Sequence, residues 1–366
     1  MKLPERFIDR MTTELGEAEA AKLCAALQTE PSTSIRLNAE KLSVPKWASK
    51  RVPWCEWGYM LDERPAFTLD PVFHAGAYYV QEASSQFAGY IMMQALGGLA
   101  ECRGRRILDV CAAPGGKSTH YASLVGCEGL VVANEINRSR AAVLADNARK
   151  WGLANMVITC NDSSRLTALE GWFDAVAVDA PCSGEGMFRK SEEAVEQWSD
   201  QNVAMCAERQ WEILNNAFRA LRPGGVLIYS TCTFNRSEDE GVLQRASEEW
   251  GDEIEPLDDI ACPEEWGVVR GREGVFQTFR FFPHKAEGEG FFAAIARKSP
   301  DAGGKSRNPK SRKSIFTAPD KRSVAELEHW VNEPQKMKWV AINDTYYGYY
   351  ASHAEDMKVL AEAMTV

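Results

Sequence analysis

Two short segments each carry a cysteine in a setting that can support covalent chemistry. Cys182 lies in DAPCSG, after one apolar run, and Cys232 lies in STCT, after another run 50 residues later. A cysteine thiolate is a strong nucleophile that can form a covalent intermediate with a substrate. Any single cysteine is more often a buried structural thiol, and a pair also raises the alternatives of a disulfide or a metal site. Two thiols at matching strand ends favour a shared reactive site.

A third segment, ILDVCAAPGGKST at residues 107–119, joins an apolar run to a glycine pair and the start of a helix. Gly115 and Gly116 allow a ligand to approach the backbone closely, and free N–H groups at a helix start can hold an anionic group. The segment lacks both the GxGxxG dinucleotide pattern and the Walker lysine pattern. The expected ligand is therefore neither NAD nor ATP.

Two acids follow the next two apolar runs. Glu135 comes after the run 130–134, and Asp162 comes after the run 156–160. A carboxylate at such a position suits the hydroxyls of a ribose, and a second one suits an adenine amino group. Either acid alone is typical of a solvated strand end. The two together predict a nucleoside pocket.

These segments lie on an alternation of apolar runs and helical patterns that begins near residue 105. The predicted strands are 106–110, 130–134, 156–160, 175–179 and 226–230. Helices are predicted at 139–151 and 205–221, and the apolar runs 276–282 and 290–297 predict a closing hairpin. The pattern indicates a doubly wound α/β fold with a parallel sheet, in which the carboxyl ends of the strands meet at one edge.

Four regions are predicted along the chain. Residues 1–100 form an N-terminal α+β domain suited to RNA binding, with a helix at 17–27, and residues 101–298 form the domain that carries the motifs. Residues 299–322 form a basic linker, because nine Lys or Arg and only two Asp lie between Arg297 and Arg322. This linker is either simply solvated or in contact with RNA. Residues 323–366 form a small C-terminal region.

The composition narrows the class of protein. Hydrophobic residues make up 45% of the 366 and charged residues 26%, with a net charge of −10, so nucleic acid binding requires local basic surface. No apolar run is long enough to span a membrane, and the first residues do not form a signal peptide. We therefore expect a cytoplasmic protein with reduced thiols. No histidine stands at metal-ligand spacing, so no metal site is expected.

The longer motifs resemble the Nol/Nop/Sun family of RNA cytosine-5 methyltransferases. DVCAAPGGKST resembles the family's cofactor loop, DAPCSGEGMFRK its fourth motif and STCTFNRSEDE its sixth. SIRLN and YVQEASS are similar to its N-terminal region, and FFPHKAEGEGFF to its closing hairpin. GEGMFRK and RFFPHK are most similar to the bacterial RsmF-type enzymes that modify 16S ribosomal RNA. The resemblance implies a Rossmann-like class I methyltransferase fold, S-adenosyl-L-methionine as cofactor, and RNA as substrate.

The resemblance also implies roles for particular residues. Cys232 is implied as the nucleophile, Cys182 as an aid to product release, and Asp179 as the active-site acid, whereas the spacing alone leaves the choice of thiol open. The implied cofactor-binding residues are Cys111, Ala112, Ala113, Pro114, Gly115, Gly116, Lys117, Glu135, Asp162 and Asp179. Arg189 and Lys190 are expected to contact phosphate or the target base.

The expected reaction is the formation of 5-methylcytosine through a thiolate adduct at C6, because C5 of cytosine is a poor nucleophile until C6 is attacked. Small-subunit ribosomal RNA is the expected substrate, with transfer RNA as the alternative, and the protein is expected to be a monomer. Two other classes stay open: a non-catalytic RNA-binding assembly factor, and a nicotinamide-dependent oxidoreductase. Enzymes of the subgroup carry a longer C-terminal end similar to a PUA domain, so residues 323–366 are expected to be a shortened version.

Overall fold

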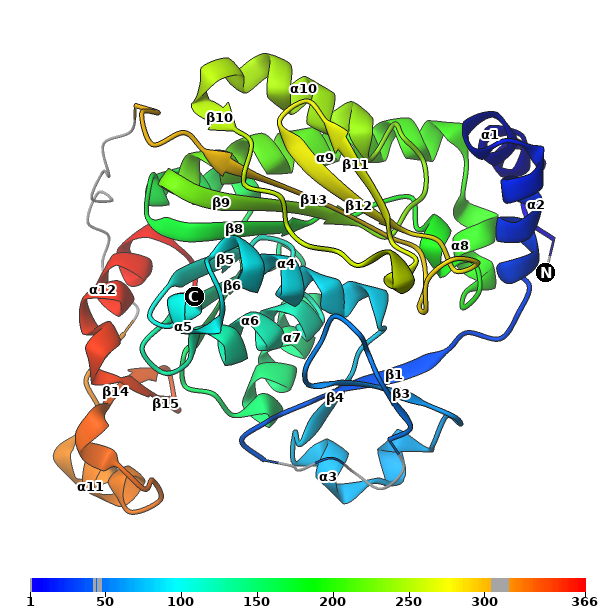
Figure 1. The fold of residues 1–366 in the computed structure, drawn as a ribbon. Coiled ribbons are helices and arrows are strands. Elements are labelled where there is room, and N and C mark those ends of the chain that lie inside the picture. Colours follow the sequence, from blue (N-terminus) through cyan, green and yellow to red (C-terminus); the bar gives the residue numbers. More distant parts are fainter. Residues whose placement is uncertain (1, 42–43, 45–47, 304–315) are drawn as a thin grey trace.

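The computed structural model describes residues 2–41, 44, 48–303 and 316–366. A large central sheet runs through the molecule with helices on both faces, and a small sheet lies against one side (Figure 1). The parallel strands are β5 (Arg106–Asp109), β6 (Leu130–Asn134), β7 (Met156–Thr159), β8 (Phe173–Asp179) and β9 (Leu221–Thr231). They stand in the order β9-β8-β5-β6-β7, which is the doubly wound arrangement that the sequence predicts.

Three antiparallel strands extend the sheet beyond β9. They are β13 (Phe291–Lys298), β12 (Phe276–Phe281) and β11 (Val269–Glu273), and a short β10 (Ile254–Glu255) also pairs with β13. Phe281 lies opposite Phe291 at the closed end of the β12–β13 pair. The predicted closing hairpin is therefore confirmed.

Helices cover the sheet because each buries an apolar stripe on one of its faces. One face packs against α4 (Phe87–Ala95) and α6 (Gly116–Val125), and the other packs against α9 (Asp200–Ala220) and α10 (Glu240–Trp250). Helix α7 (Arg138–Trp151) begins at Asn137, whose side chain accepts hydrogen bonds from two backbone N–H groups. The shorter helices are α5 (Leu99–Cys102) and α8 (Glu192–Gln197).

Helix α9 starts five residues earlier than the predicted 205–221. Ser199 accepts a hydrogen bond from the Asn202 N–H group and so caps the helix before the apolar periodicity becomes visible. At its other end the helix stops at Ala220, and β9 begins at once with Leu221. The sequence RPGG, at residues 222–225, therefore lies within the first part of the strand.

The N-terminal region begins with two helices, α1 (Glu5–Leu15) and α2 (Glu17–Ala26), the second close to its predicted bounds. A four-stranded sheet follows in the order β2-β3-β1-β4, accompanied by the short helix α3 (Pro71–His74). Its strands are β1 (Thr33–Leu37), β2 (Lys50–Arg51), β3 (Gly58–Leu61) and β4 (Tyr78–Val80). This sheet lies beside α6 and α7 rather than apart from them (Figure 1).

The C-terminal region contains α11 (Lys321–Glu328), the hairpin β14 (Met337–Ile342) and β15 (Thr345–Tyr350), and α12 (Ala354–Ala363). Met357, Leu360 and Ala363 of α12 join the same apolar cluster as the central sheet. The last helix of the C-terminal region therefore packs into the main core. The division of the chain into four regions stays a prediction. Residues 304–315 of the predicted basic linker lie outside the described residues.

Candidate functional site

The motif residues converge on the carboxyl edge of the central sheet. In the strand register Asp109 of β5 lies opposite Ala133 and Ala177, and Asp179 of β8 lies opposite Ser230. Each parallel strand ends at this edge, so segments far apart in the sequence meet there. The loop 110–115 then leads into α6, whose first turn has no side-chain cap.

A cavity of about 420 Å³ opens at this edge. Its walls come from three parts of the chain: the N-terminal sheet, the glycine-rich loop and the end of β8. It is lined by Ser32, Thr33, Ser34, Arg64, Tyr79, Val80, Gln81, Glu82, Ser85, Asp109, Cys111, Ala112, Ala113, Pro114, Gly116, Lys117, Asp179, Met187 and Lys190. Most of the predicted cofactor loop thus faces one cavity.

Lys117 and Asp179 form an ion pair in the wall of this cavity. The Lys117 ammonium donates to Asp179 Oδ2 at 2.8 Å, and the Ser230 hydroxyl donates to Asp179 Oδ1 at 2.8 Å. Burial lowers the pKa of Lys117, but the adjacent Asp179 carboxylate outweighs it and the net shift is upward. Lys117 therefore stays charged at neutral pH, and its hydrogen bond fixes the orientation of the Asp179 carboxylate.

The two thiols meet as the spacing predicts. Cys182 Sγ and Cys232 Sγ lie 3.1 Å apart and share a hydrogen bond, and both side chains are partly buried. The hydrogen bond to Cys232 and burial raise the pKa of Cys182 well above its usual range. Cys182 therefore stays protonated, and its S–H group can donate to the neighbouring sulfur.

Two buried acids join the loops that carry these thiols. Glu185, from the first loop, accepts from the Thr233 hydroxyl at 2.7 Å and from the Phe234 N–H group at 2.9 Å. Glu238, from the second loop, accepts from the Ser183 N–H group at 2.9 Å. Hydrogen bonds to a buried carboxylate are among the stronger ones in proteins. Each loop thus holds the other in place.

A close backbone contact joins the same loops. The Gly186 N–H group donates to the Cys232 carbonyl at 2.7 Å. A Cβ atom at Gly186 would lie 2.6 Å from the Cys232 oxygen and 2.7 Å from the Gly290 oxygen. Only glycine fits at this position, so close packing of the backbone explains the second glycine of the GEG sequence.

The predicted ribose ligand Glu135 is buried and only partly satisfied. Its Oε1 accepts from the Asn137 N–H group at 2.9 Å, whereas its Oε2 accepts no hydrogen bond and lies 3.4 Å from an Arg140 nitrogen. An open acceptor on a buried carboxylate suits a ligand hydroxyl. Asp162 is exposed instead and caps the following turn through the Ser164 N–H group. Neither acid lines the cavity described above.

Asp109 lies in the site but was not among the residues predicted from the sequence. It lies in the cavity wall, accepts from the Ser118 hydroxyl at 2.6 Å through Oδ2, and leaves Oδ1 without a partner. Burial raises the pKa of Asp109 to about 7. Its position as the last residue of the first strand, directly before the glycine-rich loop, was the available signal.

Arg189 and Lys190 have different surroundings, although a side-chain nitrogen of each lies 3.5 Å from the buried carboxylate of Glu289. Arg189 donates to the carbonyls of Thr29, Glu30 and Gly288, so its guanidinium is taken up within the protein. Lys190 lines the cavity. Glu289, which the sequence reading also missed, is buried 3.5 Å from the Lys190 nitrogen, and neither of its carboxylate oxygens accepts a hydrogen bond.

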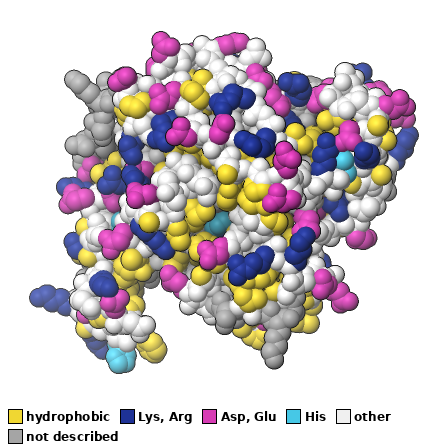
Figure 2. Space-filling model, viewed as in Figure 1, with side chains coloured by type: hydrophobic (Ala, Val, Ile, Leu, Met, Phe, Trp, Pro, Cys, Tyr) yellow, Lys and Arg dark blue, Asp and Glu magenta, His cyan; other side chains and the backbone are white. Residues whose placement is uncertain are grey.

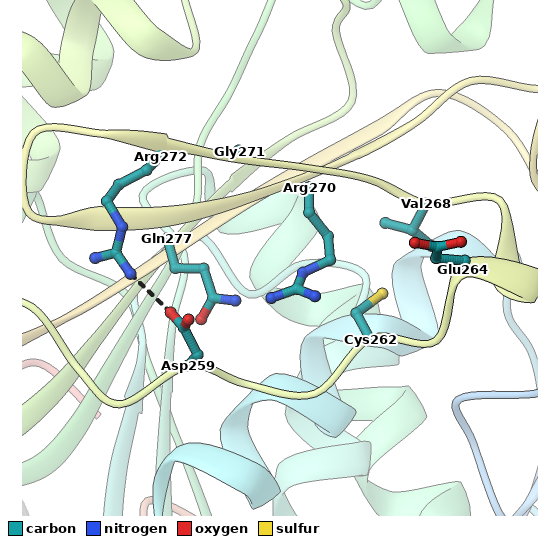
Figure 3. A pocket seen from close by; sticks show the side chains of 8 residues that line it. All are labelled: Asp259, Cys262, Glu264, Val268, Arg270, Gly271, Arg272 and Gln277. Carbon is teal, nitrogen blue, oxygen red and sulfur yellow. Dashed lines mark hydrogen bonds and ion pairs between the residues drawn. The ribbon is translucent and has the colours of Figure 1, made fainter.

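Other surface features do not add to this site. A hollow of about 470 Å³ beside β11 presents Arg270 and Arg272 toward the loop that bears Asp259 (Figure 3), and none of the residues that line it belongs to the motifs. On the face shown in Figure 2, basic and acidic side chains are interspersed. Among the described residues no cluster of three or more His, Cys, Asp or Glu could hold a metal ion, and no helix there is long and apolar enough to cross a bilayer.

The doubly wound sheet, with its cavity beside the first glycine-rich loop, defines a Rossmann-like α/β fold of the methyltransferase class. The solved structure of a methyltransferase homologue from Pyrococcus horikoshii superposes with a TM-score of 0.64 at 28% identity, over 81% of this chain and 95% of that one.

Sequence comparisons identify the family. The pattern described as 16S rRNA methyltransferase RsmB/F matches residues 98–297, and that of the N-terminal domain of 16S rRNA methyltransferase RsmF matches residues 3–83. The chain belongs to this RsmB/F family.

Two curated relatives carry the name ribosomal RNA small subunit methyltransferase F. The protein from Erwinia tasmaniensis is 36% identical over 81% of this chain and 63% of its own length. That from Vibrio vulnificus is 33% identical over 94% of this chain and 76% of its own length. The chain therefore spans less than two thirds of the first of these relatives.

Proposed function

We propose that the protein transfers a methyl group from S-adenosyl-L-methionine to C5 of a cytosine in small-subunit ribosomal RNA. The contact between Cys182 and Cys232 at the edge of a methyltransferase sheet carries this proposal. A scaffold that only binds RNA needs neither thiol, and an oxidoreductase needs the dinucleotide glycines that the chain lacks. The names of the relatives favour ribosomal over transfer RNA. The monomeric state stays a prediction.

The cavity suits the methionine end of this cofactor. Asp109 offers a free carboxylate oxygen for an ammonium group, and the uncapped start of α6 offers N–H groups for a carboxylate. Glu135 offers an open acceptor for a ribose hydroxyl. When bound, the cofactor supplies a methyl sulfonium as the electrophile.

The chain's own residues then perform the remaining steps. The Cys232 thiolate forms a bond to C6 of the cytosine, and the electron pair displaced from the C5–C6 double bond makes C5 nucleophilic. We expect Asp179, whose carboxylate Lys117 orients, to stabilise the adduct at N3 of the ring. After C5 gains the methyl group, a base removes the C5 proton, the S–C6 bond breaks and the double bond returns. Cys182, protonated and 3.1 Å away, is the group that we expect to assist this release.

The direct test is transfer of isotope-labelled methyl from the cofactor to purified RNA, followed by mass spectrometry of the nucleosides. We expect labelled 5-methylcytidine from small-subunit ribosomal RNA and none from transfer RNA. Label on transfer RNA alone would assign the alternative substrate. Label that is absent from C5 of cytosine in both RNAs would refute the proposed chemistry.

The pKa of Asp109 predicts a pH dependence of cofactor binding. The pKa of Asp109 is about 7 in the folded protein and about 4 in the unfolded chain. The free energy of unfolding therefore falls as the pH rises from about 4 to 7, because the unfolded chain releases this proton more readily than the folded protein does. A ligand ammonium prefers the ionised form. We expect the affinity for S-adenosylhomocysteine, measured by calorimetry, to rise about tenfold between about pH 6 and 8.

Three charged groups, Asp179, Lys117 and Glu135, act on Asp109 together with the Ser118 hydroxyl, so variants are needed to assign the titration. Asp109→Asn should abolish the slope. Asp162→Asn, which changes an exposed acid outside the cavity, should keep it. A profile that is flat in the unaltered protein, or unchanged in Asp109→Asn, would exclude this role for Asp109.

A further inference from the structure

Arg36, in strand β1 of the N-terminal sheet, reaches into the base of the cofactor loop. Its side chain is fully buried. Nε donates to Gln81 Oε1 at 2.8 Å, and Nη2 donates to the Gly116 carbonyl at 2.9 Å and to the Thr119 hydroxyl at 2.6 Å. One planar guanidinium therefore joins the N-terminal sheet to the first turn of α6.

Two of these partners form the wall of the cavity. Both Gln81 and Gly116 line it, and the Thr119 hydroxyl also donates to the Gly115 carbonyl at 2.8 Å. The guanidinium is held from its other side by the Trp151 ring, whose centroid lies 4.5 Å from the Arg36 Cζ atom. A shift of Arg36 would therefore move the glycine-rich loop and the opposite wall together.

The charge of Arg36 has no acidic partner in the part of the chain that the structure describes. Among the described residues no carboxylate lies within ion-pair distance of it, and Nη1 is buried without a hydrogen bond. Burial lowers the pKa of Arg36 to about 10, so the group remains charged at neutral pH. An unpaired buried charge is costly, and it favours a negative group nearby. The adjacent α6 start, without a side-chain cap, has the same preference.

We propose that Arg36 is a positioning residue of the cofactor site, which shapes the glycine-rich loop through Gly116 and Gln81 and adds positive potential for the carboxylate of the cofactor's methionine end. The inference rests on the cofactor cradle proposed above. It makes the N-terminal sheet a part of the cofactor site. Removing that sheet would then weaken cofactor binding even without RNA.

A purely structural role for Arg36 would be to dock the N-terminal sheet, and Asn38 provides the matched control. Asn38 lies two residues along the same segment and is also buried. Its Nδ2 donates to the Gly76 carbonyl at 3.2 Å and to the Trp151 carbonyl at 2.9 Å. It docks the same segment against α7 without touching the cofactor loop.

The test measures S-adenosylhomocysteine affinity by calorimetry for Arg36→Met, Arg36→Lys and Asn38→Ala in the full chain. We expect Arg36→Met to weaken binding at least tenfold. Arg36→Lys should weaken it less, because lysine keeps the positive charge but lacks the planar guanidinium that bonds several partners at once. Asn38→Ala should remain within about twofold of the unaltered protein. With saturating cofactor, Arg36→Lys should retain kcat while its KM for the cofactor rises.

Equal effects of Arg36→Lys and Asn38→Ala, or a loss in kcat without a change in cofactor affinity, would overturn the inference. Circular dichroism and thermal unfolding identify a variant that does not fold, and Arg36→Lys then decides the question alone. The binding measurement contains no RNA. Normal cofactor affinity with no methyl on C5 therefore contradicts the proposed reaction, whereas unaltered affinity in the Arg36 variants contradicts only this inference.

Discussion

Cys232→Ala should abolish methyl transfer, with a loss greater than about 10⁴-fold, because the neighbouring thiol, Cys182, is kept protonated and is a poor nucleophile in that form. Cys182→Ala should instead accumulate a protein–RNA adduct that survives denaturation. Its thiol lies 3.1 Å from the nucleophile and is kept protonated, so its removal leaves bond formation possible but slows release. Denaturing gel electrophoresis with labelled RNA separates the two outcomes.

The two variants control for each other, since each removes one sulfur from the same contact. Cys206→Ala gives a further control, because Cys206 is a buried thiol of α9 that donates to the Asn202 side-chain oxygen. It should leave transfer within about twofold. Turnover in Cys232→Ala together with an inactive Cys182→Ala would make Cys182 the nucleophile and reverse the assignment.

Asp179→Asn should lower kcat by about 10²–10⁴-fold, the usual range for the loss of a positioned acid or base. The change also leaves the Lys117 ammonium buried without its partner, which costs about 3–5 kcal/mol of stability when an ion pair is broken on one side only. We therefore expect a lower thermal unfolding midpoint as well as slow transfer. Single-turnover kinetics with excess enzyme reports the chemical step.

Asp174→Asn is the matched control because Asp174 lies at the other end of the same strand. It pairs with Arg105 and Arg222 away from the cavity. This variant should lose stability while its kcat under folded conditions changes little. If the two variants slow transfer equally, the effect of Asp179→Asn is one of folding and the proposed role of Asp179 is wrong.

The strands of the central sheet could be predicted from the pattern of apolar residues along the sequence. The strands β5 to β9 have continuous apolar runs because both faces of a parallel sheet are buried, and their positions were predicted to within a few residues. The N-terminal sheet was harder to see. Its strands are two to five residues long, and the buried Arg36 and Asn38 interrupt the apolar pattern of the SIRLN segment.

The site was predicted as far as strand order brings residues to one edge. Cys182, Cys232 and Asp179 follow that rule. Asp109 lies at the same edge but was not among the predicted residues. Contacts made by long side chains do not, because their reach depends on packing between distant segments. Arg189 turned toward the carbonyls of Thr29 and Glu30, and Glu289 came to lie beside Lys190. Only a three-dimensional structure reveals such pairings.

The exchange of hydrogen bonds between the two thiol loops has a consequence for how this protein can be altered. Glu185 of the first loop accepts a hydrogen bond from Thr233 of the second, and Glu238 of the second accepts one from Ser183 of the first. A loop transplanted alone from a distant homologue would bring a foreign partner to a buried carboxylate and leave it unpaired. The two loops, although their cysteines are 50 residues apart, therefore depend on each other for stability. Substitutions in one loop should combine non-additively with substitutions in the other. In a chimera or a directed-evolution library, both loops therefore have to be exchanged or varied together.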